Sequence, residues 1–345
     1  MWASGAYGYF SDYLLWYVLL GSLLIHAWCF FRFFSRVRRR MRLVFGNALV
    51  LLCLLAFVGL VGETYFRFVS VETDANGTSL TAKRWHKAYA QLNSQFFRDK
   101  EWTVDKPAEM HRIAFVGDSF VYGWGINDSA DRFGDILQRR FAERGDSEVE
   151  VLNFGWSDWD TRDEFRGLRD VIGDYHPDEV VLCYLANDIE KLFARPDPNR
   201  ENTTFLIDTQ SSFLLDWMFH GVIAHRSHAA AAYYDAVYRA HFDPQIWARQ
   251  AEALQRIIDW CAERGVRLRV AILPLIKTPG VEYDATRLHA KVTAFFREQG
   301  IAVVDLLGSI GGRDPDTLVV NARDPHPNET ANRLFADAIW DAFWK

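Results

Sequence analysis

Two long stretches near the start of the chain carry no charged side chain. Residues 13–31 and 43–62 contain no Asp, Glu, Lys or Arg, over 19 and 20 positions respectively. A bilayer core about 30 Å thick needs roughly 20 apolar residues in a helix, and each stretch meets that length. The pattern predicts two transmembrane helices at about 13–31 and 43–62, which form a membrane hairpin over residues 1–62.

The segment between the two stretches is rich in arginine, with Arg32, Arg36, Arg38, Arg39, Arg40 and Arg42. Short loops with an excess of Lys and Arg stay on the cytoplasmic side of a membrane. We therefore expect a protein of the bacterial inner membrane that contacts the lipid bilayer. The loop should face the cytoplasm, and both ends of the chain should lie on the periplasmic side.

Two other interpretations of the apolar stretches were considered. A cleavable signal peptide has a basic segment before its apolar run, but residues 1–11 contain no Lys or Arg. A pair of buried core helices would not normally need two uncharged runs of this length. The pattern favours the membrane hairpin over both.

After a mixed, polar connector at 63–110, apolar runs of two kinds alternate along residues 111–345. Short β-branched and apolar runs predict strands at 113–117, 148–153, 179–185, 268–273 and 302–306. Helical spacing, often ended by Gly, predicts helices at 133–144, 160–175, 246–264, 285–299 and 329–344. Strands that alternate with helices form parallel sheets with right-handed crossovers. We expect a three-layer α/β domain with a five-stranded parallel sheet.

An insertion interrupts this alternation at about 189–244, between the third and fourth strands. It is far longer than an ordinary connection and contains several apolar and aromatic clusters. It could be a lid, or a surface that touches the bilayer or an acyl chain. The alternative is a helical insertion that packs on its own domain, and the pattern favours this one because apolar side chains usually lie in a core.

Charge and composition exclude several functions. The 345 residues carry a net charge of −6, but residues 1–70 hold seven Arg against Asp12 and Glu63, so the rest of the chain carries −11. A nucleic-acid-binding domain would concentrate positive charge, so nucleic acid is not an expected partner. The four Cys form no CxxC pair, and no phosphate-binding glycine motif occurs, so we expect neither a metal nor a cofactor.

Polar residues suited to catalysis follow three of the predicted strands. Ser119 follows the first strand in Gly-Asp-Ser-Phe, Gly155 lies just after the second, and Asn187 follows the third. A fourth motif, Asp324-Pro-His326, stands near the C-terminus. The G-x-S-x-G elbow is absent, since Val121 occupies the position of its second Gly. Each fragment alone has a structural explanation, but the four in this order are far less probable by chance.

Together these blocks resemble the SGNH (GDSL) hydrolase family, over roughly two-thirds of the chain from about residue 112. The resemblance implies a flavodoxin-like domain and a serine esterase that cleaves or transfers acyl groups without a metal. It also implies roles for five residues. Ser119 would be the nucleophile, His326 the base and Asp324 its acidic partner, with an oxyanion hole from the N–H of Ser119, the N–H of Gly155 and the side-chain amide of Asn187.

The chemistry of these side chains suits the roles. A Ser hydroxyl needs a base to take its proton, and imidazole can do so near neutral pH. A carboxylate partner fixes the tautomer of the imidazole and stabilises its charged form. Donors aimed at the developing oxyanion contribute about 3 kcal/mol each.

Two positions depart from the family pattern. The acid usually stands three residues before the His, where this chain has Arg323, so Asp324 would have to reach the imidazole from a bent loop. A Gly usually stands two residues before the Asn, where this chain has Leu185. A dyad of Ser119 and His326 therefore stays open. For Asp118 and Asp188 we expect structural roles.

The function predicted from the sequence is hydrolysis of O-acyl, most simply acetyl, esters by a membrane-anchored enzyme through a Ser119 acyl-enzyme. An acylated carbohydrate or a small ester would be the substrate. Two alternatives stay open. One is an O-acyltransferase that uses the same residues to pass the acyl group to a cell-envelope glycan, and the other is a membrane-tethered binding module whose site has decayed.

Overall fold

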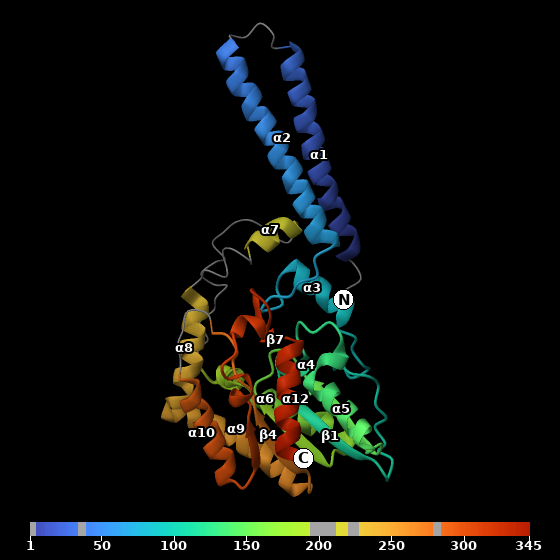
Figure 1. The fold of residues 1–345 in the computed structure, drawn as a ribbon, viewed down its shortest axis with the longest axis vertical. Coiled ribbons are helices and arrows are strands. Elements are labelled where there is room, and N and C mark those ends of the chain that lie inside the picture. The colour runs from blue at the N-terminus through green and yellow to red at the C-terminus, as the bar shows by residue number, and fades with distance from the viewer. Residues whose placement is uncertain (1–4, 34–38, 194–211, 220–227, 279–283) are drawn as a thin grey trace.

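One parallel sheet organises the computed structural model, which describes residues 5–33, 39–193, 212–219, 228–278 and 284–345. The sheet has the order β2-β1-β3-β4-β5. Figure 1 shows it among the helices that surround it. Its strands are β1 His111–Gly117, β2 Val149–Gly155, β3 Glu179–Tyr184, β4 Arg267–Ile272 and β5 Ala302–Asp305. This is the flavodoxin-like order. The predicted α/β fold with a five-stranded parallel sheet is confirmed.

Helices cover both faces of the sheet. Alternate residues of β1 show why two cores form, since Ala114 and Val116 face one side and Ile113 and Phe115 the other. On the first side lie α6 Thr161–Asp170, α9 Pro244–Glu263 and α10 Ala285–Glu298. On the second side lie α5 Phe133–Arg144 and α12 Glu329–Phe343. The three layers bury every strand residue of β3, as its apolar sequence requires.

The structure differs from the predicted elements of the α/β domain in several details. The helix predicted at 160–175 ends at Asp170, and the 3-10 helix η2 Ile172–Tyr175 follows. Strand β2 extends to Gly155. A two-stranded antiparallel sheet, β6 Val319–Asn321 and β7 Asp324–Pro327, was not predicted because it is short and contains two prolines. The remaining short elements are η1 Ser129–Asp131, α11 Leu307–Ile310 and η7 Pro315–Thr317.

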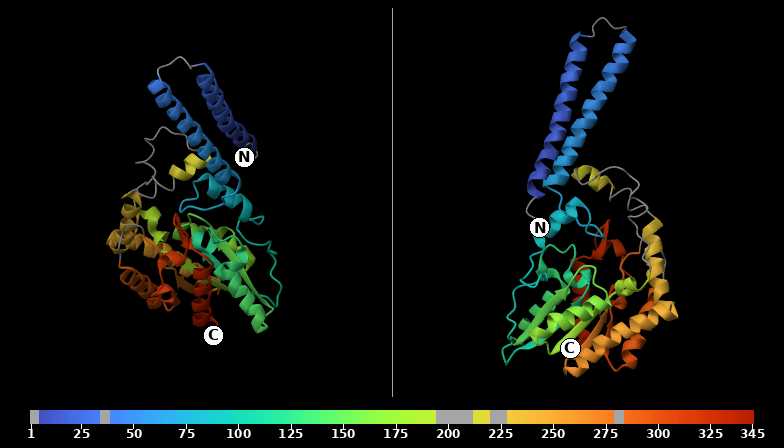
Figure 2. Two further views of the ribbon diagram at one scale, coloured as in Figure 1. Left: turned by 45° about the horizontal axis from the view of Figure 1, so that its top comes forward. Right: turned by 180° about the vertical axis from the view of Figure 1, so that it is seen from behind.

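The N-terminal segment is a hairpin of two helices, α1 Gly5–Phe33 and α2 Arg39–Phe68, which lie side by side and project from the α/β domain (Figure 2). Both are long and apolar enough to cross a membrane. The side chains of Val18 and Val44 are 65% and 67% exposed, so no protein core covers them. This exposure contradicts the interpretation as core helices. Part of the arginine-rich loop, residues 34–38, lies outside the described residues.

The segment expected to be a connector packs closely on the α/β domain. Helix α2 continues six residues beyond the predicted end of the membrane segment, and there Glu63 and Arg67 are buried. Helix α3 Leu80–Tyr89 follows, with Trp85 almost fully buried. The guanidinium of Arg98, itself 2% exposed, donates to the carbonyls of Gly123 and Ile126, each at 2.6 Å. Residues 63–110 thus form part of the folded domain.

Two helices of the insertion are described, α7 Phe213–Met218 and α8 His228–Phe242, whereas residues 194–211 and 220–227 lie outside the described residues. Helix α8 packs on α9 and on the 3-10 helix η3 Ala186–Leu192, which follows β3. Helix α7 instead packs on α2 and α3, at the base of the hairpin (Figure 1). The described part of the insertion therefore contacts both the α/β domain and the hairpin.

Candidate active site

Ser119 is the first residue of the one-turn helix α4 Ser119–Tyr122, which follows β1 directly. The side chain of Asp118 caps this turn by accepting the N–H of Phe120 at 2.9 Å. A Cβ at Gly117 would lie 2.6 Å from Cγ2 of Val121 and 3.1 Å from the carbonyl oxygen of Cys183, so Gly allows α4 and β3 to come this close to the end of β1. The strand end and the turn together present the Ser119 hydroxyl at the carboxyl edge of the sheet, where α/β proteins bind ligands.

Ser119, His326 and Asp324 form one line of hydrogen bonds. The Oγ of Ser119 lies 2.8 Å from Nε2 of His326, and Nδ1 of the same ring lies 2.5 Å from Oδ1 of Asp324. The sequence predicted that Asp324 reaches the imidazole from a bent loop. In the structure both Asp324 and His326 lie on strand β7. Residues i and i+2 of a strand point to the same side, so a two-residue spacing brings the carboxylate to the imidazole.

The protonation pattern of this line follows from its partners. An ionised Asp324 can only accept, so Nδ1 of His326 carries the proton and Nε2 is free to accept from the Ser119 hydroxyl. Burial alone would lower the pKa of His326. The charge and hydrogen bond of Asp324, with the charges of Asp118 and Asp74, outweigh burial and raise this pKa above its ordinary value.

Asn187 reaches the same site from the end of β3. It lies in η3, and its side-chain amide donates to Oδ2 of Asp118 at 3.2 Å. The same Oδ2 lies 3.4 Å from the Oγ of Ser119, so Asp118 links the two side chains. An amide has two N–H groups, and the described residues offer the second one no acceptor. The predicted nucleophile, base, acid and amide therefore lie together, although they come from three separate parts of the chain.

Gly155 has a different arrangement from the one expected. Its single backbone N–H, proposed as an oxyanion donor, donates to the side chain of Asn153 at 3.1 Å. A Cβ at Gly155 would lie 2.1 Å from the backbone N of Tyr122, so Gly lets β2 pack against α4. The amide of Asn153 also donates to the carbonyl of Val121 at 2.7 Å. In this structure Gly155 and Asn153 hold the turn that carries Ser119. A role for the Gly155 N–H in the oxyanion hole requires its hydrogen bond to Asn153 to break.

The model of the family described as GDSL-like lipase/acylhydrolase matches residues 115–334. The chain belongs to this family. It is an SGNH-type serine hydrolase that acts on ester bonds, as the resemblance in its sequence implied.

Among solved structures, this hydrolase is similar to TesA. The two share 16% identity over 68% of this chain and 98% of the TesA chain, with a TM-score of 0.45. It is also similar to the psychrotrophic esterase EstA from Pseudoalteromonas, with 14% identity over 67% and 96% and a TM-score of 0.42. A third is a catalytic mutant of Axe2, an acetylxylan esterase from Geobacillus stearothermophilus, with 13% identity over 69% and 96% and a TM-score of 0.43. The comparison with curated proteins found no match.

Two buried carboxyl groups lie behind the active site of the hydrolase. Glu164 of α6 and Asp188 of η3 are 0% and 1% exposed. Among the described residues neither oxygen of Glu164 has a hydrogen-bond partner, whereas Asp188 accepts the N–H of Leu185. Burial, with the nearby charge of Asp118, raises the pKa of both groups well above the ordinary value. Both groups therefore resist ionisation, which suits the structural role expected for Asp188.

Sequence reasoning missed residues of the connector and the insertion that reach this site. The hydroxyl of Thr73 donates to Oδ2 of Asp324. From the insertion, Tyr233 of α8 donates to the carboxylate of Glu190, three residues after Asn187, at 2.5 Å. The neighbouring Tyr234 is partly buried, and this burial together with the charge of Asp324 raises its pKa to about 12. No motif marks these residues, since Thr73 and Asp324 are 251 positions apart.

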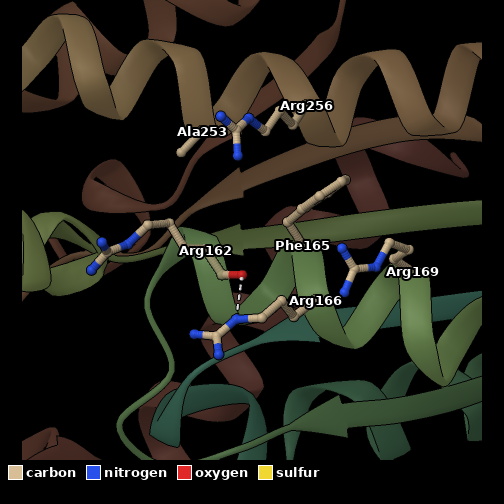
Figure 3. Close-up of a pocket in the computed structure, with 6 residues that line it drawn as sticks. All are labelled: Arg162, Phe165, Arg166, Arg169, Ala253 and Arg256. Atoms are coloured by element: carbon tan, nitrogen blue, oxygen red, sulfur yellow. Dashed lines mark hydrogen bonds between the residues drawn. The ribbon is translucent and has the colours of Figure 1, made fainter.

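A surface groove between α6 and α9 lies away from these residues (Figure 3). It is lined by Phe165, Ala253, Arg162, Arg166, Arg169 and Arg256. Each guanidinium pairs with its own carboxylate, on Asp160, Asp163, Asp170 and Glu252 respectively. Its positive charge is thus compensated, and the groove contains none of the predicted site residues.

Proposed function

We propose that the protein is a membrane-anchored esterase in which Ser119 forms an acyl-enzyme. The observation that carries this proposal is the continuous line from the Ser119 hydroxyl through His326 to Asp324. His326 would take the proton of Ser119 as the hydroxyl attacks the ester carbonyl, and would then return it to the leaving alcohol. Asp324 would stabilise the imidazolium formed between these steps. Water would release the acid in a second round of the same chemistry.

The oxyanion formed in each step needs hydrogen-bond donors at the end of the sheet. The backbone N–H of Ser119, at the start of α4, and the second amide N–H of Asn187 support this role by their positions. Gly155 is the third donor that the sequence predicts. It would join them only if substrate binding releases its N–H from Asn153.

We further propose that α1 and α2 cross the bacterial inner membrane, with Arg32–Arg42 in the cytoplasm and the hydrolase on the periplasmic side. In this arrangement residues 1–62 form the hairpin, and residues 63–110 connect it to the hydrolase domain at 111–345, on which they also pack. The length and apolar exposure of both helices, and the arginines between them, support the proposal. The substrate would be an O-acyl, most simply acetyl, ester on a cell-envelope carbohydrate or small molecule.

Labelling by a fluorophosphonate tests the nucleophile, because this probe reacts with activated serines. We expect the full-length protein in detergent to be labelled, and the Ser119→Ala variant to remain unlabelled. A folded wild-type protein that takes up no label would contradict the proposal and favour a binding module.

Transfer of the acyl group to a glycan hydroxyl is the alternative fate of the same acyl-enzyme. Product analysis with and without a glycan acceptor distinguishes the two reactions. Hydrolysis predicts free acetate at the same rate in both samples. A transferase would form acylated glycan at the expense of acetate when the acceptor is present.

A further inference from the structure

The carboxylate of Asp324 is held from two sides. Its Oδ1 faces His326 and accepts the ring Nδ1 at 2.5 Å and the backbone N–H at 3.1 Å. Its Oδ2 accepts the hydroxyl of Thr73. Asp324 is 0% exposed and Thr73 is 2% exposed, so water does not compete for these bonds. Rotation of the carboxyl group about its Cβ–Cγ bond would break the contacts on both sides at once.

Thr73 is itself fixed against the loop that joins β6 and β7. Its carbonyl accepts the side-chain amide of Asn321 at 3.1 Å. On either side of it, Glu72 pairs with Arg323 and the N–H of Ala75 donates to the carbonyl of Arg323 at 3.0 Å. The segment 72–75 therefore lies alongside the residues that lead into Asp324, and it fixes the position of the Thr73 hydroxyl.

The segment 72–75 is also anchored on its other side, by the loop that follows Ser119 and α4. The indole N–H of Trp124 donates to the carbonyl of Asp74 at 3.1 Å. Gly125 comes so close that a Cβ there would lie 3.2 Å from Oγ1 of Thr73. Thr73 thus lies between the loop that follows Ser119 and the strand that carries Asp324 and His326.

We propose that Thr73 is a positioning residue of the active site, which keeps Oδ1 of Asp324 directed at Nδ1 of His326. The proposal rests on the function proposed above, since it assigns Thr73 a place in that catalytic line. It also means that the segment following the hairpin completes the active site. A carboxylate bonded through one oxygen alone could turn away from the imidazole, and His326 would then lose the partner that stabilises its charged form.

A purely structural role is the competing explanation, in which Thr73 only satisfies a buried carboxylate. Three variants of the full-length protein in detergent separate the two. Thr73→Val keeps the shape but removes the hydroxyl, and Thr73→Ser keeps the hydroxyl. Thr293→Val is the matched control, because Thr293 on α10 is buried and its hydroxyl has no partner among the described residues.

Steady-state kinetics on a soluble acetyl ester give the first readout. We expect Thr73→Val to lower kcat about ten-fold or more, with KM changed much less, because the lost bond is made to a charged group. Thr73→Ser and Thr293→Val should remain within about two-fold of wild type. In an Asp324→Asn background, Thr73→Val should have almost no further effect, since Thr73 acts through Asp324.

The pH profile gives the second readout. Because Asp324 keeps the pKa of His326 raised, a loosened Asp324 should move the acid limb of kcat/KM to lower pH in Thr73→Val. Asp118 and Asp74, which also raise this pKa, are unchanged in the variant.

Three outcomes would overturn the inference. Thr73→Val could keep the kcat and the acid limb of wild type, or Thr73→Ser could lose as much kcat as Thr73→Val. The third is a Thr73→Val effect on kcat that is as large in the Asp324→Asn background as in wild type. Wild-type protein that neither hydrolyses esters nor reacts with a fluorophosphonate would instead contradict the proposed function. Active wild type with an unaffected Thr73→Val would contradict only the role of Thr73.

Discussion

Asp324 stands two residues before His326 and shares one side of strand β7 with it. Its Oδ1, the carboxylate oxygen that faces the imidazole, accepts both the ring N–H and the backbone N–H of His326. Arg323, the residue at the spacing usual for the family, instead pairs with Glu72. This geometry supports Asp324, and not Arg323, as the acid of the proposed triad.

Replacement of this acid gives the first prediction. Asp324→Asn keeps the size of the side chain but loses its charge, so turnover of an acetyl ester should fall about a hundred-fold or more. Substitution of Arg323 by Ala should cost less. The Asp324→Asn loss should not add to that of Ser119→Ala, since residues that act as a unit are not additive. Near-normal turnover in Asp324→Asn would mean that Ser119 and His326 work as a dyad.

Glu164 gives a prediction about stability. Its pKa is raised in the folded state, so the carboxyl is neutral at low pH and resists ionisation as the pH rises. The stability contributed by the neutral form is present below the unfolded pKa, near about 4.3, and is lost as the pH climbs toward the folded value. Glu164→Gln removes this penalty.

We therefore expect Glu164→Gln to raise the melting temperature at pH 8 by about 2–4 °C, which corresponds to about 1 kcal/mol, and to have little effect at pH 4. Thermal denaturation of both proteins at pH 8 and at pH 4 tests this prediction. Glu143→Gln, on the exposed surface of α5, is the control and should change neither. An equal shift at both pH values would contradict an ionisation effect.

At the scale of elements, α7 joins the hairpin to the hydrolase. Glu63 of α2 accepts the N–H groups of Phe213 and Leu214 at the start of α7, and the hydroxyl of Ser212. Asp216 of α7 in turn accepts the N–H of Leu80, where α3 begins. The buried ion pair of Glu63 with Arg67 fixes the carboxylate that accepts the bonds from the start of α7.

Loss of the Glu63 charge should release this junction, because it removes the carboxylate that pairs with the buried Arg67, at a cost of about 3 kcal/mol. For Glu63→Gln we expect the amides of Phe213 and Leu214 to exchange hydrogen about a hundred-fold faster, while amides of β3 keep their protection. Hydrogen exchange followed by mass spectrometry measures both segments in one experiment, again with Glu143→Gln as the control. Unchanged exchange in α7 would show that Glu63 does not hold it.

Most elements of the α/β fold could be predicted from the sequence, whereas strand β7, Thr73 and Glu63 could not. The five strands and their helices could be predicted because each has a clear apolar period, and Ser119, Asn187 and His326 could be placed because they end strands or carry a family motif. Strand β7 could not, because four residues with two prolines show no strand pattern. Thr73 and Glu63 could not either, because their roles depend on contacts with residues far away in the sequence.

At the scale of the molecule, α4 and β7, the elements that carry Ser119 and His326, lie on the hairpin side of the domain (Figure 1). Helix α2 has 30 residues and is about 45 Å long, which exceeds a bilayer core of about 30 Å. Its last turns are therefore free to dock on the hydrolase, as the burial of Leu60, Glu63 and Arg67 requires. Thr73 lies five positions after Phe68, and five residue steps span at most about 18 Å. The proposed site would thus be held close to the membrane surface.

The proposed topology gives the prediction that belongs to this scale. Alkaline phosphatase fused after Lys345 should be active in cells, since that enzyme folds only outside the cytoplasm, and GFP fused at the same point should be dark. The arginines between the two helices motivate this orientation. A bright GFP fusion with a silent phosphatase fusion would reverse the topology.

The covalent intermediate at Ser119 is the most direct test of the mechanism. The full-length protein, quenched with acid during turnover of an acetyl ester and digested, should yield one acetylated peptide that contains Ser119, as seen by mass spectrometry. The same peptide from Ser119→Ala should carry no acetyl group. Continued turnover by Ser119→Ala, or an acetyl group on another residue of the wild type, would contradict the proposed mechanism.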